Sequence, residues 1–280
     1  MRELNVEEIT RHIGEMCIEA NHALTPDMQE RLHRARKEEA SSLGAQILSQ
    51  LEQNLEIAGR DMIPICQDTG MAVVFLEIGQ EVFLTGGDLT EAVNEGVRRG
   101  YVDGYLRKSV VKDPLLRENT RDNTPAILHT EIVPGDQVRI TVAPKGFGSE
   151  NMSRVVMLKP ADGEEGVLEA IVRAALDAGP NACPPMVIGV GVGGTFEKCA
   201  LLAKKALTLP VDSHSELPHI RRIEEEALRR INESGIGPAG LGGKTTALSV
   251  RILTWPTHIA GLPVGINICC HVNRHAVRTI

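Results

Sequence analysis

Aromatic residues are scarce in this sequence of 280 residues, which has one Trp, two Tyr and four Phe. Surfaces that bind single-stranded nucleic acid stack bases on aromatic side chains, and this chain offers few of them. It also lacks a dense run of Lys and Arg, and its formal net charge is −7. An acidic chain without a basic patch is a poor match for a phosphate backbone. We therefore expect no nucleic-acid partner.

Long hydrophobic runs and a leader segment are also missing. Residues 1–8 lack the basic start and apolar block of a signal peptide, and no apolar run is long enough to cross a bilayer. We expect a cytoplasmic protein with no membrane partner. Six cysteines are too few for a disulfide scaffold in a chain of this length. In a reducing compartment they are expected to be core thiols, metal ligands or nucleophiles.

Hydrophobic periodicity changes between helical and strand spacing along the chain, which predicts an α/β fold. No repeat, low-complexity segment or linker divides it, so we expect a single domain over residues 1–280, with N-terminal helices packed on mixed β-sheets. A helical segment should cover residues 1–60. Apolar spacing predicts a first helix over residues 6–24, and Thr25-Pro26 predicts the start of a long second helix that ends near Ala58.

Turn and capping residues divide the rest of the chain into short elements. Asp88 and Glu91 form a capping-box pattern before a helix that should end near Gly104. Residues 126–133 and 137–142 flank a Pro-Gly-Asp turn, which predicts an antiparallel hairpin. The other expected helices are residues 164–176, 195–207 and 217–234. The other expected strands are residues 71–78, 186–194, 247–254 and 262–270, followed by a short basic tail over residues 271–275.

One segment without helix or strand periodicity, Pro64 to Gly70, gathers side chains that suit chemistry. Cys66 offers a thiolate for iron or zinc, Gln67 an amide, and Asp68 a carboxylate that can move protons beside a metal. Gly70 would let the backbone come close to a ligand. The alternative is a buried core cysteine at the start of a strand, followed by an ordinary Asp-Thr-Gly turn. The segment alone leaves both interpretations open.

Three glycine-rich segments suit an anion or close packing. Residues 145–151 (KGFGSEN) combine a cation, a hydroxyl and free backbone donors. Residues 189–194 have dinucleotide-binding spacing, but no convincing strand–helix–strand unit with an acidic residue follows, so we prefer tight strand–helix packing or a helix terminus aimed at an anion. Residues 242–246 resemble a phosphate loop, yet Pro238 stands where its first glycine belongs and a helix precedes it. We therefore discount nucleotide hydrolysis.

The spacing of the cysteines matches no zinc finger or ribbon. Cys17 lies on an apolar helical stripe, which indicates core packing. Cys66, Cys183 and the pair Cys269-Cys270 lie in irregular or terminal segments, so a site built from them would be assembled by the fold. Three thiolates would suit an iron–sulfur cubane with one iron open to substrate, and zinc with three cysteines and a water is the alternative.

The order of these motifs resembles one known family, the alpha subunits, or N-terminal halves, of the class I iron–sulfur fumarate hydratases and tartrate dehydratases. The resemblance covers most of the chain, and the matching stretches occur in the family's order. They are residues 65–70 (ICQDTG), 105–107 (YLR) with 122–126 (DNTPA), 145–151 (KGFGSEN) and 181–185 (NACPP), and the closing His258 and Cys270.

The resemblance implies a [4Fe-4S] cluster with one open iron, whose three ligands match Cys66, Cys183 and Cys270. Adjacent strand residues point to opposite faces, so only one of Cys269 and Cys270 should reach the cluster. We choose Cys270 because the family's cysteine directly precedes a bulky side chain, here His271.

Other matching positions surround the bound dicarboxylate in the family. Asp68 is implied to transfer a proton at the leaving hydroxyl. The implied substrate-binding positions are Gln67, Arg107, Gly148 of the 146–148 loop, and His258. Phe147 interrupts what is usually a run of glycines, which leaves open which loop amide meets the substrate.

The resemblance implies a hydro-lyase that adds or removes water across a carbon–carbon bond of a four-carbon dicarboxylate, with fumarate and L-malate first and L-tartrate as the alternative. A nucleotide-binding regulatory protein with unreactive cysteines is the hypothesis from another class. In fused members of the family the catalytic base, a threonine, and further basic residues lie in a C-terminal domain, whereas this chain ends ten residues after Cys270. We therefore expect a beta subunit as partner, with a heterotetramer of two such pairs as the symmetric assembly.

Overall fold

The computed structural model describes residues 2–280, and the chain divides into two compact units. Unit 1 runs up to Thr25 and also contains Leu55–Phe147 and Arg274–Ile280, whereas unit 2 contains Pro26–Asn54 and Gly148–Asn273. Each unit has its own four-stranded mixed sheet with helices, which confirms the predicted α/β class. The single domain over residues 1–280, with its helical segment over residues 1–60, stays a prediction.

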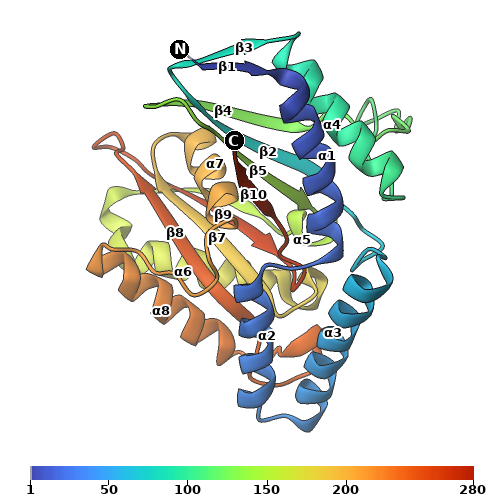
Figure 1. The fold of residues 1–280 in the computed structure, drawn as a ribbon. Coiled ribbons are helices and arrows are strands. Elements are labelled where there is room, and N and C mark those ends of the chain that lie inside the picture. Colours follow the sequence, from blue (N-terminus) through green and yellow to red (C-terminus); the bar gives the residue numbers. More distant parts are fainter. Residues whose placement is uncertain (1) are drawn as a thin grey trace. The chain divides into compact units, whose positions relative to one another are not determined.

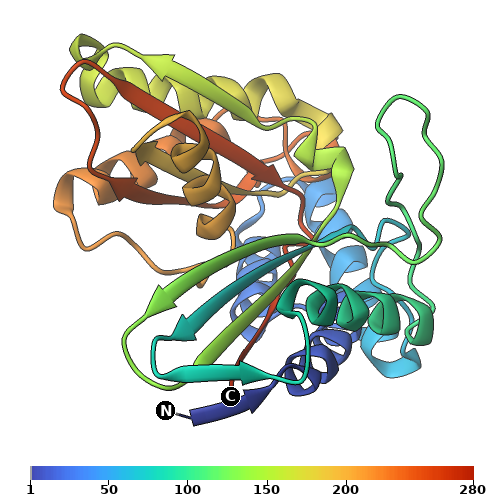
Figure 2. The same cartoon turned by 90° about the horizontal axis from the view of Figure 1, so that it is seen from above.

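The sheet of unit 1 has the strand order β10-β5-β2-β4 and carries two helices on one face (Figures 1 and 2). Its strands are β2 (Met71–Gly79), β4 (Ile127–Val133), β5 (Val138–Lys145) and β10 (Ala276–Thr279). A parallel pair, β1 (Arg2–Asn5) and β3 (Val82–Thr85), also belongs to this unit. The helices α1 (Val6–His22) and α4 (Leu89–Asp103) begin after Asn5 and Asp88, whose side chains accept hydrogen bonds from N–H groups of the first turn. Both helices were predicted.

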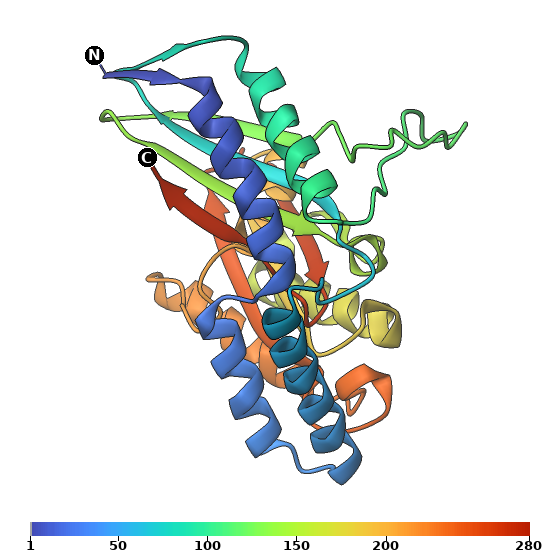
Figure 3. The ribbon, with the colours of Figure 1, turned by 45° about the vertical axis from the view of Figure 1, so that its right-hand side comes forward.

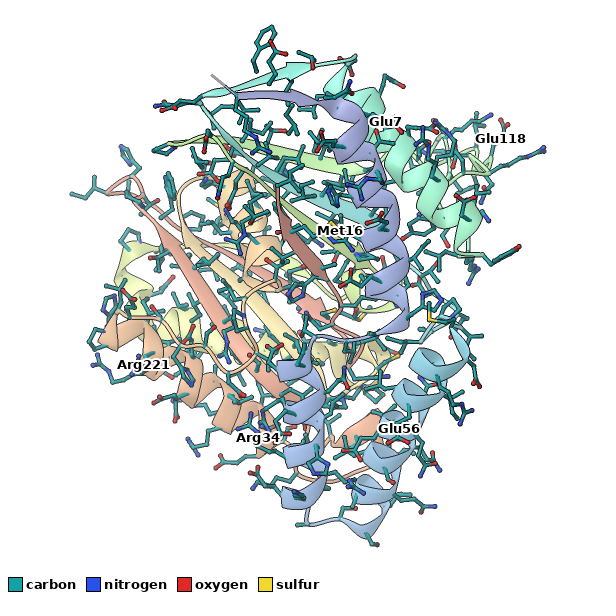
Figure 4. The ribbon with its side chains drawn as sticks, viewed as in Figure 1. Glu7, Met16, Arg34, Glu56, Glu118 and Arg221 are labelled. Carbon is teal, nitrogen blue, oxygen red and sulfur yellow. The ribbon has the colours of Figure 1, made fainter. Side chains whose placement is uncertain are left out.

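Glycine lets α1 and α4 pack closely against each other. A Cβ atom on Gly96 would lie 2.6 Å from the carbonyl oxygen of Thr10, and one on Gly100 would lie 2.7 Å from that of Gly14. Any larger residue would force the two backbones apart. Met16 of α1, labelled in Figure 4, is fully buried in the core that the helices share with the strands. This packing fixes the helix that leads into the Arg107 segment.

The predicted hairpin of residues 126–133 and 137–142 is wrong in its pairing, although both strands exist. β2 lies between β4 and β5, parallel to β4 and antiparallel to β5. β2 is almost continuously buried, so pairing along both of its edges satisfies its backbone. The connecting turn passes close to the end of β2, because a Cβ atom on Gly79 would lie 2.3 Å from the carbonyl oxygen of Gly135.

The sheet of unit 2 has the strand order β6-β9-β7-β8 and carries helices on both faces (Figure 1). Its strands are β6 (Arg154–Leu158), β7 (Met186–Gly193), β8 (Ala247–Trp255) and β9 (Leu262–Cys269). Its helices are α2 (Pro26–Glu38), α6 (Gly163–Ala178), α7 (Phe196–Ala206), α8 (Pro218–Asn232) and the four-residue α5 (Phe147–Glu150), which starts on the last residue of unit 1. Ile188 and Val190 of β7 share a core with α6 and α8.

The glycines between these two residues pack against α7. A Cβ atom on Gly189 would lie 2.2 Å from the carbonyl oxygen of Ala203, and one on Gly191 would lie 2.1 Å from that of Cys199. No side chain fits into such a gap. The dinucleotide-like spacing is therefore explained by tight strand–helix packing, one of the two interpretations preferred from the sequence.

The long second helix predicted from Thr25-Pro26 to about Ala58 is wrong, because the chain forms two helices there. α2 ends at Glu38 and α3 (Ser42–Asp61) starts after a short break, and their backbones run side by side (Figure 3). The Glu39 carboxylate accepts hydrogen bonds from the N–H groups of Ser41 (3.0 Å), Lys244 (2.8 Å) and Thr245 (2.8 Å). The Ser41 hydroxyl then accepts from the N–H of Gly44, as an N-cap does.

The remaining predicted helices and strands are confirmed to within a few residues at their ends. The strands β1, β3, β6 and β10 were not predicted, and β10 pairs with β5 just beyond the predicted basic tail. Single turns of 3-10 helix form at Pro160–Asp162, Gly179–Ala182 and Pro238–Gly240. Among residues 2–280, no helix is both long and apolar enough to cross a membrane.

Candidate functional site

The segment around Cys66 is an irregular loop of unit 1 between α3 and β2. Cys66 and Asp68 are partly exposed, Gln67 is exposed, and Thr69 and Gly70 are buried. The N–H of Asp68 donates to Cys66 Sγ at 3.4 Å, and Gln67 Oε1 lies 3.3 Å from the same sulfur. The interpretation of Cys66 as a buried core cysteine is wrong, because the residue is partly exposed.

Both carboxylate oxygens of Asp68 are held by backbone N–H groups of unit 1. Oδ1 accepts from Gly70 at 3.0 Å, and Oδ2 accepts from Phe147 at 2.8 Å. A Cβ atom on Gly146 would lie 3.1 Å from Oδ2, so glycine at this position leaves room for the carboxylate. The glycine-rich segment was predicted to suit an anion, and in unit 1 the anion that it binds is the side chain of Asp68.

Arg107 lies in the long loop between α4 and β4, residues 104–126, which we call the excursion. This loop belongs to unit 1 and stands away from α4 (Figures 2 and 3). Glu118, labelled in Figure 4, belongs to the same excursion. The carbonyl of Arg107 accepts a 3.0 Å hydrogen bond from the Thr69 hydroxyl, which joins the excursion to the Cys66 loop. The Arg107 side chain is exposed, and its guanidinium makes no hydrogen bond or ion pair among residues 2–280. It is available to a carboxylate.

Cys183 and Cys270 both belong to unit 2 and lie at the same end of its sheet. Cys183 is exposed in a left-handed conformation (φ 52°) three residues before β7, and Cys270 directly follows β9, which pairs antiparallel with β7. The carbonyl of Cys183 lies 3.1 Å from His271 Nδ1, a contact that joins the two cysteine segments. Cys269 is buried, whereas Cys270 is partly exposed. This difference supports the choice of Cys270.

The remaining two cysteines are buried. Cys17 has no exposed surface and lies in the core of unit 1, as predicted. Burial raises the pKa of its thiol to about 12, and burial also raises the pKa of Cys199, which packs against the sheet of unit 2. Thiols that resist ionisation are poor metal ligands at neutral pH.

Gly148 belongs to α5 and is exposed. A Cβ atom placed on it would meet nothing within 4 Å, and its φ is not positive. Neither packing nor backbone strain within the chain therefore requires glycine there. A glycine whose backbone is open on one side suits close approach of a ligand to the main chain.

His258 lies apart from Cys183 and Cys270 within unit 2, and its place in the substrate site stays a prediction. It lies before β9, whereas Cys270 follows that strand. Eight residues of extended strand separate the two ends, which is roughly 25 Å. His258 is exposed, and its Nδ1 accepts from the N–H of Ala260 at 3.2 Å. Within unit 2 it borders an apolar cavity of about 440 Å³ with Trp255 and Ile259.

Three buried side chains that the sequence analysis did not single out contact the Cys66 loop within unit 1. They are Tyr101 of α4, Asn123 of the excursion and Arg274 of the C-terminal segment. Asn123 lies within a matching stretch of the family. Tyr101 looked like an ordinary core residue of a helix, and Arg274 looked like part of a basic tail, so no sequence signal indicated their contacts.

Among residues 2–280, no group of three or more His, Cys, Asp or Glu side chains is arranged to hold a metal ion. Cys66 belongs to unit 1, and Cys183 and Cys270 belong to unit 2. The chemistry of these donors nevertheless fits an iron–sulfur cluster. All three thiols lie at loop positions with exposed surface, whereas the other three are buried. One of them already accepts a backbone N–H.

Comparisons with known proteins show which family the chain belongs to. A family profile described as fumarate hydratase (Fumerase) matches residues 10–279. The chain is similar to the putative L(+)-tartrate dehydratase subunit alpha of Methanocaldococcus jannaschii, with 38% identity over 279 residues and 98% of each chain covered. It is also similar to the L(+)-tartrate dehydratase subunit alpha of Escherichia coli K12 and of Shigella sonnei, with 27% identity over 272 residues, which cover 96% of this chain and 89% of theirs. The resemblance seen in the sequence is confirmed, and the chain belongs to the fumarate hydratase (Fumerase) family of hydro-lyases.

Proposed function

We propose that this chain is the alpha subunit of a hydro-lyase that adds water to, or removes it from, a four-carbon dicarboxylate. The observation that carries the proposal is the Cys66 loop, where a thiol with exposed surface and a carboxylate held by two N–H groups lie two residues apart. Family membership supplies the reaction class. The loop supplies a metal ligand and a proton carrier side by side.

The cluster that the family resemblance implies is a [4Fe-4S] centre held by Cys66, Cys183 and Cys270. When bound, such a centre with one open iron acts as a Lewis acid on the hydroxyl that leaves as water. Exposed surface on all three cysteines supports this ligand set. The N–H of Asp68 points at Cys66 Sγ, so the sulfur already accepts a backbone donor.

Asp68 is the proposed proton carrier at the leaving hydroxyl. Each of its oxygens accepts one N–H, which leaves a lone pair on each for a proton. The two N–H groups also hold the carboxylate in one orientation, so that a proton delivered there does not wait for a side-chain rotation. Gln67 lies in the same loop, is exposed, and would contact the bound substrate through its amide.

Two substrates deserve direct comparison. The sequence analysis placed fumarate and L-malate first, and the name of the family agrees with that order. The relatives that match almost the whole chain are named for L(+)-tartrate, which moves L(+)-tartrate to the front of our proposal. Both are four-carbon dicarboxylates, so the same carboxylate contacts would serve either one.

The proposed partner is a beta subunit, since the relatives are named as alpha subunits. In this proposal the partner contributes the base that removes the proton from carbon and further basic groups for the substrate. The substrate would be enclosed only when both chains are present, which excludes bulk water from the reacting atoms.

Anaerobic reconstitution tests the proposed function. The chain should be purified alone and with its beta subunit, loaded with iron and sulfide, and assayed with L(+)-tartrate, L-malate, fumarate and methylated analogues. We expect a brown protein, activity only from the pair, and preference for one of the first three compounds. A colourless pair that turns over none of them would favour the regulatory-protein hypothesis. Substantial activity of the lone chain would remove the need for the partner.

Arg107, together with an amide near Gly148, is proposed to bind a substrate carboxylate. Arginine offers a planar pair of N–H donors that lysine lacks, so Arg107→Lys should raise KM at least tenfold while kcat falls less. Arg117→Lys is a matched control, because Arg117 is exposed on the same excursion. Initial rates of the reconstituted pair over a range of substrate concentrations give both constants. An unchanged KM for Arg107→Lys would argue against this contact.

A further inference from the structure

Three consecutive carbonyl groups of the Cys66 loop accept hydrogen bonds from buried side chains of unit 1. The Tyr101 hydroxyl contacts the carbonyls of Thr69 (2.7 Å) and Gly70 (3.1 Å), and Asn123 Nδ2 donates to that of Gly70 at 3.1 Å. Arg274 Nη2 donates to the carbonyl of Asp68. Because the carbonyls are held on the inner side, the loop presents Cys66 and Gln67 outward.

Arg274 differs from the other two contacts because it brings a charge into the interior. The residue is only 5% exposed, and its Nη1 is buried with no hydrogen-bond partner among residues 2–280. Burying a guanidinium with an unsatisfied N–H group is unfavourable, whereas an apolar side chain of similar length would carry no such cost. Packing alone does not explain a buried guanidinium with an unsatisfied N–H group, so another role of Arg274 is expected.

The position of Arg274 suggests that role. Its Nε donates to the carbonyl of Pro144 at 3.2 Å while its Nη2 holds the carbonyl of Asp68. The same two segments meet a second time, where the N–H of Phe147 holds Oδ2 of Asp68 at 2.8 Å. One contact fixes the backbone of Asp68, and the other fixes its carboxylate. The Arg274 guanidinium therefore sets the distance between the Asp68 backbone and the Pro144 segment, and at this distance the N–H of Phe147 reaches the Asp68 carboxylate.

We propose that Arg274 is a positioning residue of the active site, which holds the Asp68 backbone against the Pro144 segment so that the Asp68 carboxylate keeps one orientation. For its effect on turnover, this inference rests on the function proposed above. Arg274 does not touch the substrate in this proposal. Its loss should therefore lower kcat and leave KM nearly unchanged, since a displacement of about 1 Å in a reacting group costs roughly 10²-fold in rate.

The test uses the reconstituted pair with Arg274→Gln and Arg274→Lys. Turnover per cluster should fall about 100-fold for Gln and about tenfold for Lys, which keeps the charge but can hold only one of the two carbonyls well. KM should stay within about threefold in both variants. Arg278→Gln is the matched control: it lies on the same C-terminal segment, pairs with Glu15 and Glu19, and makes no contact with the loop. Its kcat should equal that of the wild type.

Hydrogen exchange gives a second measurement that does not depend on catalysis. The N–H groups of Gly70 and Phe147, which hold Asp68, should exchange at least tenfold faster in the Arg274 variants than in the wild type, while α6 exchanges as before. Should Arg274→Gln fail to fold, Arg274→Lys decides by both measurements. Unchanged exchange at these two groups, or a rise in KM that matches the loss of kcat, would overturn the proposal. If the wild-type pair is inactive, the proposed function fails, and hydrogen exchange alone decides the role of Arg274.

Discussion

Serine at any one of Cys66, Cys183 or Cys270 is expected to remove iron and inorganic sulfide from the purified protein and to abolish hydratase activity. A cubane with three protein thiolates has no spare ligand, and a serine hydroxyl does not ionise near neutral pH. Iron, sulfide and zinc content of each variant, measured after anaerobic reconstitution, check this prediction together with activity. Zinc without sulfide in the wild type would contradict the cluster and favour the three-cysteine zinc site.

The buried cysteines provide matched controls for this experiment. Cys17→Ala, Cys199→Ala and Cys269→Ala each delete a buried thiol, so they should cost some stability yet keep iron and sulfide at the level of the wild type. The comparison of the adjacent pair is the most informative. Loss of the cluster in Cys269→Ala and its retention in Cys270→Ser would reverse the assignment of the third ligand.

Asp68→Asn is expected to keep the cluster and to lower kcat by about 10²–10⁴-fold, the usual worth of a general acid or base. The amide has nearly the same shape and can still accept the N–H of Gly70 or Phe147 through its oxygen, so the loop should keep its fold. What it cannot do is carry a proton. Steady-state kinetics at fixed iron content measure the loss.

Asp113→Asn is the matched control for this substitution. The Asp113 carboxylate also accepts two backbone N–H groups, those of Leu115 (2.8 Å) and Leu116 (2.7 Å), in an exposed turn of the same unit. Its replacement should change kcat by less than about twofold, since it carries no proposed chemistry. If Asp68→Asn behaves like this control while its cluster is intact, then Asp68 only shapes the turn.

Local patterns predicted local structure well in this chain. The cap at Asp88, the apolar spacing of α1 and the glycine packing of β7 against α7 all depend on residues close together in the sequence. The hairpin failed because the partner that separates its strands, β2, lies about 50 residues upstream in the sequence. The long helix failed for a similar reason, since Glu39 binds N–H groups more than 200 residues away.

In the candidate site, too, residues close together in the sequence were predicted, whereas contacts between residues far apart in the sequence were not. Motif chemistry led to Cys66 and Asp68, and the structure brings Cys183 to Cys270 through His271. His258 and Cys270 lie at opposite ends of the predicted strand over residues 262–270, and an extended strand keeps its two ends apart, so the place of His258 in the substrate site stays a prediction. Arg274 could not be found from the sequence, since its role depends on Asp68 and Pro144, which are more than 100 residues away.

The Glu39 carboxylate has a consequence for the phosphate-like loop of residues 242–246. Burial raises the pKa of Glu39, but hydrogen bonds from Lys244, Ser41 and Thr245 lower it more, so the group stays ionised. A carboxylate fixed in the same folded unit competes with a free anion at an effective concentration that dissolved phosphate does not approach. The N–H groups of Lys244 and Thr245 are therefore already occupied by an anion of the chain itself. An incoming nucleotide phosphate could bind them only after the segment between α2 and α3, which carries Glu39, had moved away.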